Sequence, residues 1–118
     1  IELLEMIYER YSNEFYLQIS SKYLNERNSL LIMKCILTQI SNIINSISSD
    51  SILVLIPSFI DSLIGCLENS KSEVRIMAVE IIVDLYFFVG EHFKVYLNSL
   101  NNNQRNLVNI FISKRQNQ

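Results

Sequence analysis

Glycine and proline are scarce in this chain, and their scarcity limits the folds that it can adopt. Only two glycines and one proline occur among 118 residues. Tight turns depend on these residues, so the sequence offers little material for a sheet protein and favours long helices. Because 49% of the residues are hydrophobic, the chain can also bury a core of its own. We therefore predict a single all-α domain over residues 1–118.

The charged and reactive residues exclude several functional classes. The formal net charge is -2 at pH 7, so we expect neither nucleic acid nor another polyanion as a partner. There is no glycine-rich phosphate loop or nucleophile–base pair, and the one histidine, His92, is expected in a solvated loop. We therefore expect no enzymatic activity, no cofactor and no metal site. The most apolar run, residues 52–56, is too short to cross a bilayer, so we expect no membrane contact.

Cysteine usage and the first residues indicate the compartment. Cys35 and Cys66 lie far apart, each within an apolar stretch, and neither belongs to a CxxC motif. We interpret both as buried structural thiols of a cytosolic protein rather than as a disulfide or metal ligands. The sequence begins with Ile1 and has no signal-peptide pattern. We expect a soluble fragment of a longer protein.

Apolar periodicity predicts about six helices separated by polar breaks. The expected helices cover residues 1–11, 14–24, 29–47, 51–68, 72–90 and 103–115. The expected caps are Ser29, Asp50 or Ser51, and Ser72. Residues 12–14 are interpreted as a break between the first two helices, and Gly90 as a stop. Pro57 is expected to kink its helix or to mark where the regular part begins.

The spacing of two long helices predicts a repeat architecture. Their starts at Ser29 and Ser72 are 43 positions apart, and each helix is the second of a hairpin. A period of this length with two antiparallel helices is typical of HEAT and armadillo solenoids. The apolar stripe of the first of them contains Met33, Ile36, Leu37, Ile40, Ile43, Ile44 and Ile47. We predict a short α-solenoid of HEAT/TOG-like antiparallel hairpins, with two full hairpins and a flanking helix at each end.

The helix at residues 72–89 has an arginine on its apolar side. On a helical wheel the acidic residues Glu73, Glu80 and Asp84 form a narrow strip that faces water. Arg75 lies nearly opposite this strip, among apolar residues, and an unpaired charge there would be too costly. We expect Arg75 to tie helices together, through helix C-terminal carbonyls or through Asp61 or Glu68. Contact with a ligand is the less favoured alternative.

Large apolar residues beside the acidic strip are candidates for partner binding. Met77, Phe87 and Phe88 flank Glu80 and Asp84, and an apolar patch rimmed by charge is typical of protein-binding surfaces. The alternative is that residues 91–97 and the last helix cover these side chains as core. Lys114 and Arg115 are candidates too, because they could meet an acidic partner, although they also suit a helix C-terminus.

Tyrosines near the N-terminus form a second candidate surface. Tyr8, Tyr11, Tyr16 and Tyr23, with Glu5 and Glu9, make up this set. Tyrosines are enriched at interfaces because one end of the side chain tolerates water. Half-buried core tyrosines would explain the same pattern, so both interpretations stay open.

An ordered block of motifs fills the second half of the chain. It consists of Val74-Arg75, Ala78, Val79, Val89-Gly90, Glu91, Phe93-Lys94, Tyr96-Leu97, Leu100, and a closing helix with Leu107, Asn109, Ile112 and Lys114-Arg115. The preceding "LVLIPSFIDSLIGCLEN" contains the proline and ends in an acidic/Asn corner. Over residues 51–116 this pattern resembles the C-terminal HEAT-type domain of the CLASP family, the CLIP-associating microtubule regulators, and the earlier residues are compatible with it.

The resemblance implies a non-enzymatic domain of a microtubule-stabilising protein. Such a domain would recruit the protein to kinetochore, spindle, plus-end or cortical partners, in the cytoplasm and on the cytoskeleton. Two alternatives stay open: a TOG-like tubulin-binding domain, and a homodimerising end cap of a longer solenoid.

Related TOG domains bind tubulin through loops that typically carry an aromatic residue, often Trp, and several basic residues. This chain has no Trp, and its candidate loops contain only Arg27 and Lys71 as cations. Tubulin binding by this domain is therefore disfavoured.

Overall fold

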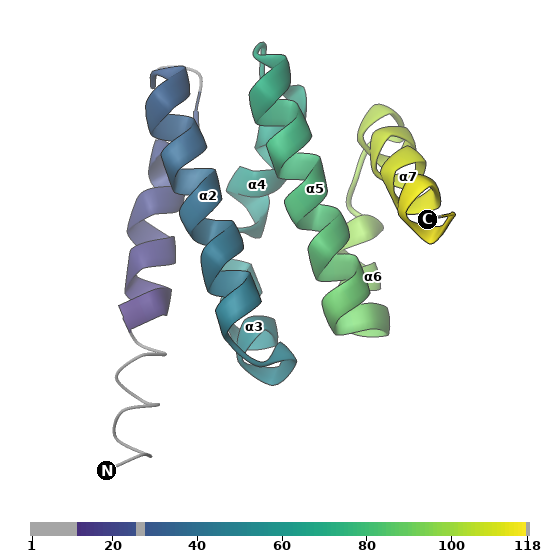
Figure 1. Ribbon diagram of the computed structural model, residues 1–118, viewed down its shortest axis with the longest axis horizontal. Coiled ribbons are helices and arrows are strands. Elements are labelled where there is room, and N and C mark those ends of the chain that lie inside the picture. The colour runs from purple at the N-terminus through teal and green to yellow at the C-terminus, as the bar shows by residue number, and fades with distance from the viewer. Residues whose placement is uncertain (1–11, 26–27, 118) are drawn as a thin grey trace.

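The computed structural model describes residues 12–25 and 28–117, and these residues form helices joined by short connections (Figure 1). After a helical segment at residues 12–20, the elements are η1 (Ser21–Tyr23), α2 (Leu30–Ser46), α3 (Ser49–Leu55), η2 (Ile56–Ser58), α4 (Ile60–Gly65), η3 (Cys66–Glu68), α5 (Ser72–Val89), η4 (Gly90–Phe93), α6 (Lys94–Leu97) and α7 (Asn102–Gln116). The predicted all-α helical hairpin fold is confirmed. The expected helix at residues 1–11 lies outside the described residues.

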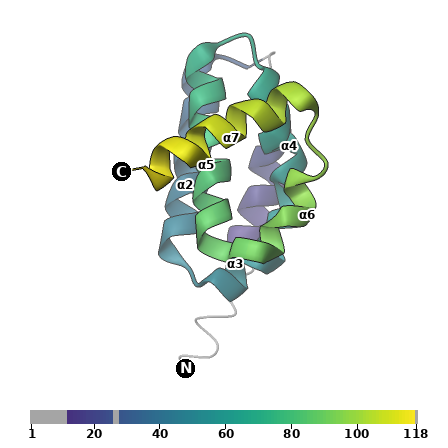
Figure 2. The ribbon, with the colours of Figure 1, turned by 90° about the vertical axis from the view of Figure 1, so that its right-hand side faces the viewer.

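The helices pair as antiparallel hairpins arranged side by side in two layers. Residues 12–23 pair with α2, the segment α3–α4 pairs with α5, and α6 is followed by α7 (Figure 1). Figure 2 shows α2 and α5 in one layer, with α3, α4 and α6 in the other. α7 crosses α5 obliquely in the same view. α5 is the central helix, because it packs against α2, α3, α4 and α7.

α2 forms as its sequence pattern predicts. The Ser29 hydroxyl accepts a hydrogen bond from the Ile32 backbone N–H at 3.2 Å, which satisfies a free donor of the first turn. The buried residues of α2 are Met33, Ile36, Leu37, Ile40 and Ile44, and Ile43 and Ile47 are partly buried against the same core. The cap and the apolar stripe are both confirmed.

The expected helix at residues 51–68 is bent rather than continuous. The axes of residues 49–58 and 60–68 differ by 70°. Pro57 lies in η2, where its missing N–H cannot continue the helical hydrogen bonds, so the predicted kink is confirmed. The predicted cap is wrong. Ser48, in extended backbone, accepts from the Ser51 N–H at 3.3 Å, so Asp50 and Ser51 fall inside the first turn.

The bent segment also bears on membrane insertion. Among the described residues no single helix is long and apolar enough to cross a membrane. The two halves of the bent segment meet the length and composition criteria only when taken together. Their buried side chains, Ile52, Leu55, Phe59 and Leu63 among them, lie in the core of the fold.

Two other expected helix starts are corrected. Residues 12–14 are helical rather than a break, because the buried Leu17 and the packing of this helix outweigh the weak helix propensity of Ser12 and Asn13. α5 begins at Ser72 itself, and its N-cap residue is Lys71, which makes no side-chain cap bond. The Asn69 side-chain oxygen accepts from the Lys71 N–H at 2.9 Å, so the asparagine shapes this turn instead.

The ends of α5 and α7 follow the sequence signals. Gly90 has φ 65° and ψ -131°, a conformation that favours glycine, and it ends α5 as predicted. α7 begins with a capping box, in which Asn101 accepts from the Gln104 N–H at 2.8 Å and Gln104 accepts from the Asn101 N–H at 3.0 Å.

The two cysteines have different environments. Cys66 is buried, and desolvation raises its pKa to about 11. Cys35 is exposed, so the prediction of two buried thiols is wrong for this residue. The cause is its position on α2, on the side opposite the stripe that contains Leu37 and Ile40.

Candidate functional site

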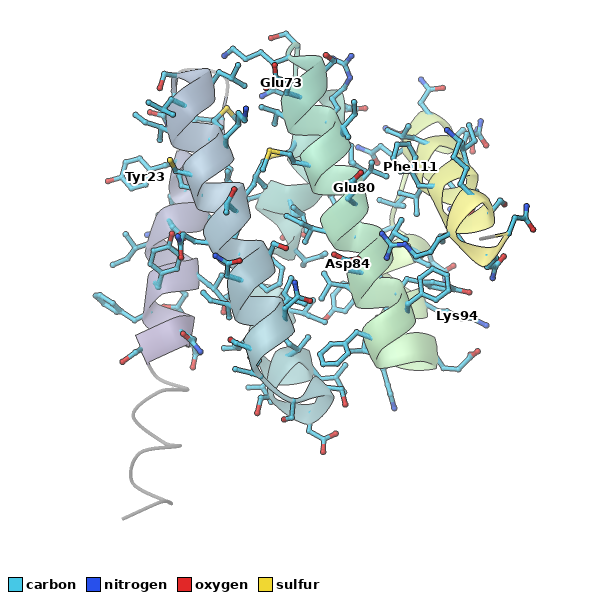
Figure 3. The ribbon with its side chains drawn as sticks, in the orientation of Figure 1. Tyr23, Glu73, Glu80, Asp84, Lys94 and Phe111 are labelled. Carbon is cyan, nitrogen blue, oxygen red and sulfur yellow. The ribbon has the colours of Figure 1, made fainter. Side chains whose placement is uncertain are left out.

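The water-facing side of α5 is the strongest candidate for a functional surface, and we call it the α5 face. It consists of Glu73, Ile76, Met77, Glu80, Asp84, Phe87 and Phe88. The helix presents this side to solvent because its other side is in the core: Val74, Ala78, Val79, Ile81, Ile82, Val83, Leu85 and Val89. Figure 3 shows Glu73, Glu80 and Asp84 following one another along α5.

Two of the three carboxylates on the α5 face pair with cations from neighbouring helices. Lys34 of α2 lies 2.9 Å from Glu73, and Arg115 of α7 lies 2.5 Å from Asp84. Glu80 is exposed and has no ion-pair partner within the described ranges. The face therefore keeps one free negative charge between two charge pairs that join α5 to α2 and α7.

The aromatic residues of the α5 face are at the surface rather than in the core. Phe87 is 44% exposed and Phe88 is 42% exposed. Tyr86 contacts the Phe87 ring edge-on, with centroids 5.1 Å apart, and the Arg115 guanidinium lies 5.7 Å from that centroid. Met77 differs from both phenylalanines, because it is half-buried and packs against the core.

The two basic residues at the end of α7 have separate environments. Arg115 contacts the α5 face through Asp84 and Phe87. Lys114 is exposed, and its ammonium lies 5.4 Å from the centroid of Phe111 on the same helix. The structure thus brings Arg115, but not Lys114, together with the other candidate residues.

A small hollow lies next to Phe87, where α5, α6 and α7 approach one another. Its volume is about 230 Å³, and it is lined by Tyr86, Phe87, Gly90, Glu91, Lys94 and Gln116. Glu91 and Lys94 form an ion pair at 2.9 Å on its rim, and the hydrogen bond from Lys94 to Glu91 raises the pKa of the lysine. The hollow is large enough for an apolar side chain of a partner.

Arg75 binds backbone carbonyls in the connection before its own helix. One guanidinium nitrogen donates to the Asn69 carbonyl at 2.7 Å and to the Ser70 carbonyl at 3.1 Å. Neither Asp61 nor Glu68, the two acidic partners considered from the sequence, forms an ion pair with Arg75. The arginine is half-buried, so its stem packs along the helix while its head joins η3 to α5.

Sequence reasoning missed two residues in this region. Asn69 is 4% exposed; its side chain accepts from Lys71, and its amide lies 3.8 Å from the Met33 sulfur. A buried asparagine just before a helix start is the signal that could have identified it. Ile76 is 47% exposed on the α5 face, and its spacing of four residues from Glu80 places it there.

The other predicted surfaces are only partly described. Tyr16 and Tyr23 are 37% and 53% exposed, whereas Tyr8, Tyr11, Glu5 and Glu9 lie outside the described residues. Of the loop cations, Lys71 is half-buried at the start of α5, and Arg27 is also outside the described residues.

His92 is exposed in η4. Over residues 12–25 and 28–117, no group of three histidine, cysteine or acidic side chains could hold a metal ion.

Comparison with known proteins gives partial similarities. No protein-family model matches the chain. A 76-residue segment is 32% identical to CLIP-associating protein 1-A and to CLIP-associating protein 1-B of Xenopus laevis, and equally to CLIP-associating protein 1 of Xenopus tropicalis. The match covers 64% of this chain but only 5% of each relative. This similarity supports a relationship with the CLIP-associating proteins, over a segment that is a small part of their length.

Proposed function

We propose that this chain is a non-enzymatic protein-interaction domain of a CLASP-like, microtubule-associated protein, and that partners bind its α5 face. Such partners would act at the kinetochore, the spindle or microtubule plus ends, in the cytoplasm and on the cytoskeleton. Two phenylalanines carry the proposal. Phe87 and Phe88 are each more than 40% exposed beside a row of carboxylates. Exposed aromatic residues with a charged rim are typical of interfaces between proteins.

The charges of the α5 face indicate what a partner should look like. Lys34 and Arg115 neutralise Glu73 and Asp84, so Glu80 is the free charge near the centre of the face. A complementary partner would place a lysine or arginine opposite Glu80 and apolar side chains against the phenylalanines. The hollow beside Phe87 would accept one of these apolar side chains as an anchor.

The similarity to CLIP-associating proteins supports a CLIP as the first partner to test. Sedimentation velocity of the full chain mixed with a CLIP would detect the complex, with soluble tubulin tested in a parallel sample. We expect a complex with the CLIP and no co-sedimentation with tubulin. Co-sedimentation with tubulin alone would instead support a TOG-like function.

Matched variants test whether the α5 face forms the interface. The double substitution Phe87→Glu with Phe88→Glu should weaken the complex at least about 10-fold, because it removes about 1.4 kcal/mol or more of binding free energy. Val54→Glu is the control, because Val54 is 47% exposed on α3, which lies in the other layer of helices (Figure 2) and does not line the hollow beside Phe87. Circular dichroism verifies that both variants fold. Equal binding by both variants, or no CLIP binding by the unmodified chain, would overturn the proposal.

A further inference from the structure

The acidic residues of this chain are confined to its first three quarters. The twelve aspartates and glutamates all lie within residues 2–91. Residues 94–118 contain no acidic side chain, and their basic residues are Lys94, Arg105, Lys114 and Arg115. Arg105 and Lys114 have no ion-pair partner among the described residues. The formal net charge of -2 therefore conceals a positive region that consists mostly of α7.

The outer side of α7 presents a row of short polar side chains to water. α7 lies at one end of the array of hairpins (Figure 1) and is nearest the viewer in Figure 2. Its inner side packs into the core through Val108 and Ile112. Its outer side carries four exposed residues that we call the α7 row: Asn102, Asn106, Asn109 and Ser113. Arg105 and Lys114 lie on opposite edges of this row, because the nine positions between them make about two and a half turns.

A broad, shallow hollow lies over the second half of the α7 row. Its volume is about 630 Å³, and it is lined by Asn106, Asn109, Ile110, Ser113, Lys114 and Asn117. Ile110 is 51% exposed and is the apolar residue of this surface. Lys114 follows it by four residues on the same edge and supplies a positive charge. A complementary ligand therefore has hydrogen-bonding groups, a negative charge and an apolar side chain.

The spacing of the α7 row matches the repeat of an extended peptide backbone. An asparagine side chain has N–H donors and a C=O acceptor, as a peptide group has. Asn102 and Asn106 are four residues apart, as are Asn109 and Ser113, which corresponds to a rise of about 6.0 Å along α7. In an extended chain, the backbone groups on one side recur every second residue, at about 6.6 Å. An extended segment along α7 can therefore pair its backbone with successive side chains of the row.

We propose that the α7 row binds an extended, acidic peptide segment of a partner protein. The backbone of this segment pairs with the amides of the row, an acidic side chain meets Lys114, and an apolar side chain two residues away lies against Ile110. Arg105 adds positive charge at the other edge, although its Nη2 already donates to two backbone carbonyls. The local charge is the reason for an acidic partner, even though the chain as a whole is acidic. No residue of the α7 row belongs to the α5 face, so this proposal is independent of the proposed function.

Nuclear magnetic resonance titration of the ¹⁵N-labelled full chain tests the proposal, because asparagine side-chain amides give signals of their own. The probe is a capped peptide of about eight residues with a repeating Glu-Glu-Val-Val pattern, which alternates glutamate and valine on each side of an extended chain. The signals of Asn106 and Asn109 should shift, with a dissociation constant of roughly 0.1–5 mM, because hydrogen bonds in water contribute little net free energy. A Lys-Lys-Val-Val peptide should bind at least about 5-fold more weakly.

Matched variants test the row and its charge separately. Asn106→Ala with Asn109→Ala should weaken binding at least about 5-fold, because both amides lose their backbone partners. The control is Asn42→Ala with Asn45→Ala, which removes two exposed asparagines of the same spacing from α2. Lys114→Gln should weaken binding and reduce its dependence on salt, with Lys22→Gln on η1 as the control. Circular dichroism verifies that all these variants fold.

Several results would overturn the proposal. One is the absence of shifts in α7 with up to about 5 mM peptide, and another is equal binding by the α7 variants and their controls. Two further peptides, methylated at alternate backbone nitrogens in either register, keep the charge but lose donors on one side. Unchanged binding of both would exclude pairing with the backbone. Tighter binding of a short oligouridine than of the acidic peptide would reassign the face to nucleic acid.

Discussion

At the scale of single residues, the contacts of a side chain determine its structural role more than its residue type does. Arg75 lies on the apolar side of α5, yet it is half-buried and bonded to two carbonyls of the preceding connection. It therefore acts on the turn between η3 and α5 rather than as a fully buried charge. Met77 and Phe88 are both large and apolar, but only Met77 packs against the core.

The first prediction concerns Arg75. Arg75→Ala should lower the free energy of unfolding by about 1.5 kcal/mol, because it removes charge-assisted hydrogen bonds to the Asn69 and Ser70 carbonyls. Arg75→Met keeps an apolar stem but has no guanidinium. It should therefore be more stable than Arg75→Ala only by the free energy that packing of the stem contributes. Urea denaturation followed by circular dichroism measures both values. Arg105→Ala is the comparison, because Arg105 also donates to carbonyls but is exposed, and we expect a smaller loss. An unchanged midpoint for Arg75→Ala would show that these bonds contribute nothing.

The second prediction concerns the two thiols. At mildly alkaline pH a small alkylating reagent should modify the exposed Cys35 first. Cys66 should react more than about 100-fold more slowly, because a pKa raised from 9.0 to about 11 lowers its thiolate fraction by that factor. Mass spectrometry at successive times gives both rates, and both thiols should react at similar rates in urea. Comparable rates in the folded chain would contradict the burial of Cys66.

The same pKa shift predicts how stability depends on pH. The folded-state pKa of Cys66 lies above the unfolded value, so the native state retains this proton when the unfolded state has lost it. The free energy that Cys66 burial contributes is therefore fully present below about pH 9 and falls as the pH rises toward 11. Cys66→Ala should show a smaller decline in stability over that interval.

At the scale of elements, caps and charge pairs hold neighbouring helices at fixed positions. Lys34–Glu73 joins α2 to α5, and Asp84–Arg115 joins α5 to α7. The exposed fractions of these four side chains range from 34% to 57%. Water screens such charges, so each pair contributes only modestly to the stability of the fold. The start of α7 is held more firmly, because Asn101 both caps the helix and donates to Glu68 at 2.9 Å.

The third prediction separates these two roles of Asn101. Asn101→Ala should lower stability by about 1 kcal/mol, since it removes the cap of α7. Asn101→Asp keeps the cap acceptor but places a carboxylate against Glu68, so it should recover only part of the loss. Adding Glu68→Gln to Asn101→Asp should restore more of the lost stability, because it removes the repulsion between the two carboxylates. Thermal unfolding measures the series, and no rescue by Glu68→Gln would refute the role of that contact.

At the scale of the whole molecule, stability is concentrated in the centre of the array of hairpins. α5 packs against α2 on one side and α7 on the other, and it also contacts α3, α4 and η4. Residues 12–20 and α7 lie at the two ends of this array (Figure 1), so among the described helices each has a neighbour on one side only. The interior of α5 should therefore open least often.

The fourth prediction follows from this arrangement. In hydrogen exchange at neutral pH, the amides of residues 79–85 in α5 should exchange most slowly, because they open only when the core unfolds. Amides of residues 12–20 and of the last turn of α7 should exchange faster. Mass spectrometry of peptides resolves these segments. Uniform protection along the chain would show that the fold opens as one unit, without a more stable centre.

The sequence by itself determined the helices. Scarce glycine and proline, the stripe of α2, the stop at Gly90 and the kink at Pro57 were all predictable, because helical periodicity and backbone chemistry act locally. Two caps were misplaced by one to three residues. The reason is that loop side chains such as Ser48 and Asn69 select the first turn through hydrogen bonds that periodicity does not reveal.

Only the tertiary structure decided which apolar residues remain in water. Cys35, Phe15 and Phe87 come from stretches as apolar as those of buried residues, yet all three are exposed. Burial of a helix face depends on whether a neighbouring helix lies over it, and that arrangement is set by contacts between distant segments. The same holds for Arg115, which reaches Asp84 only because α7 crosses α5. The exposed faces proposed as binding surfaces are therefore properties of the assembled fold.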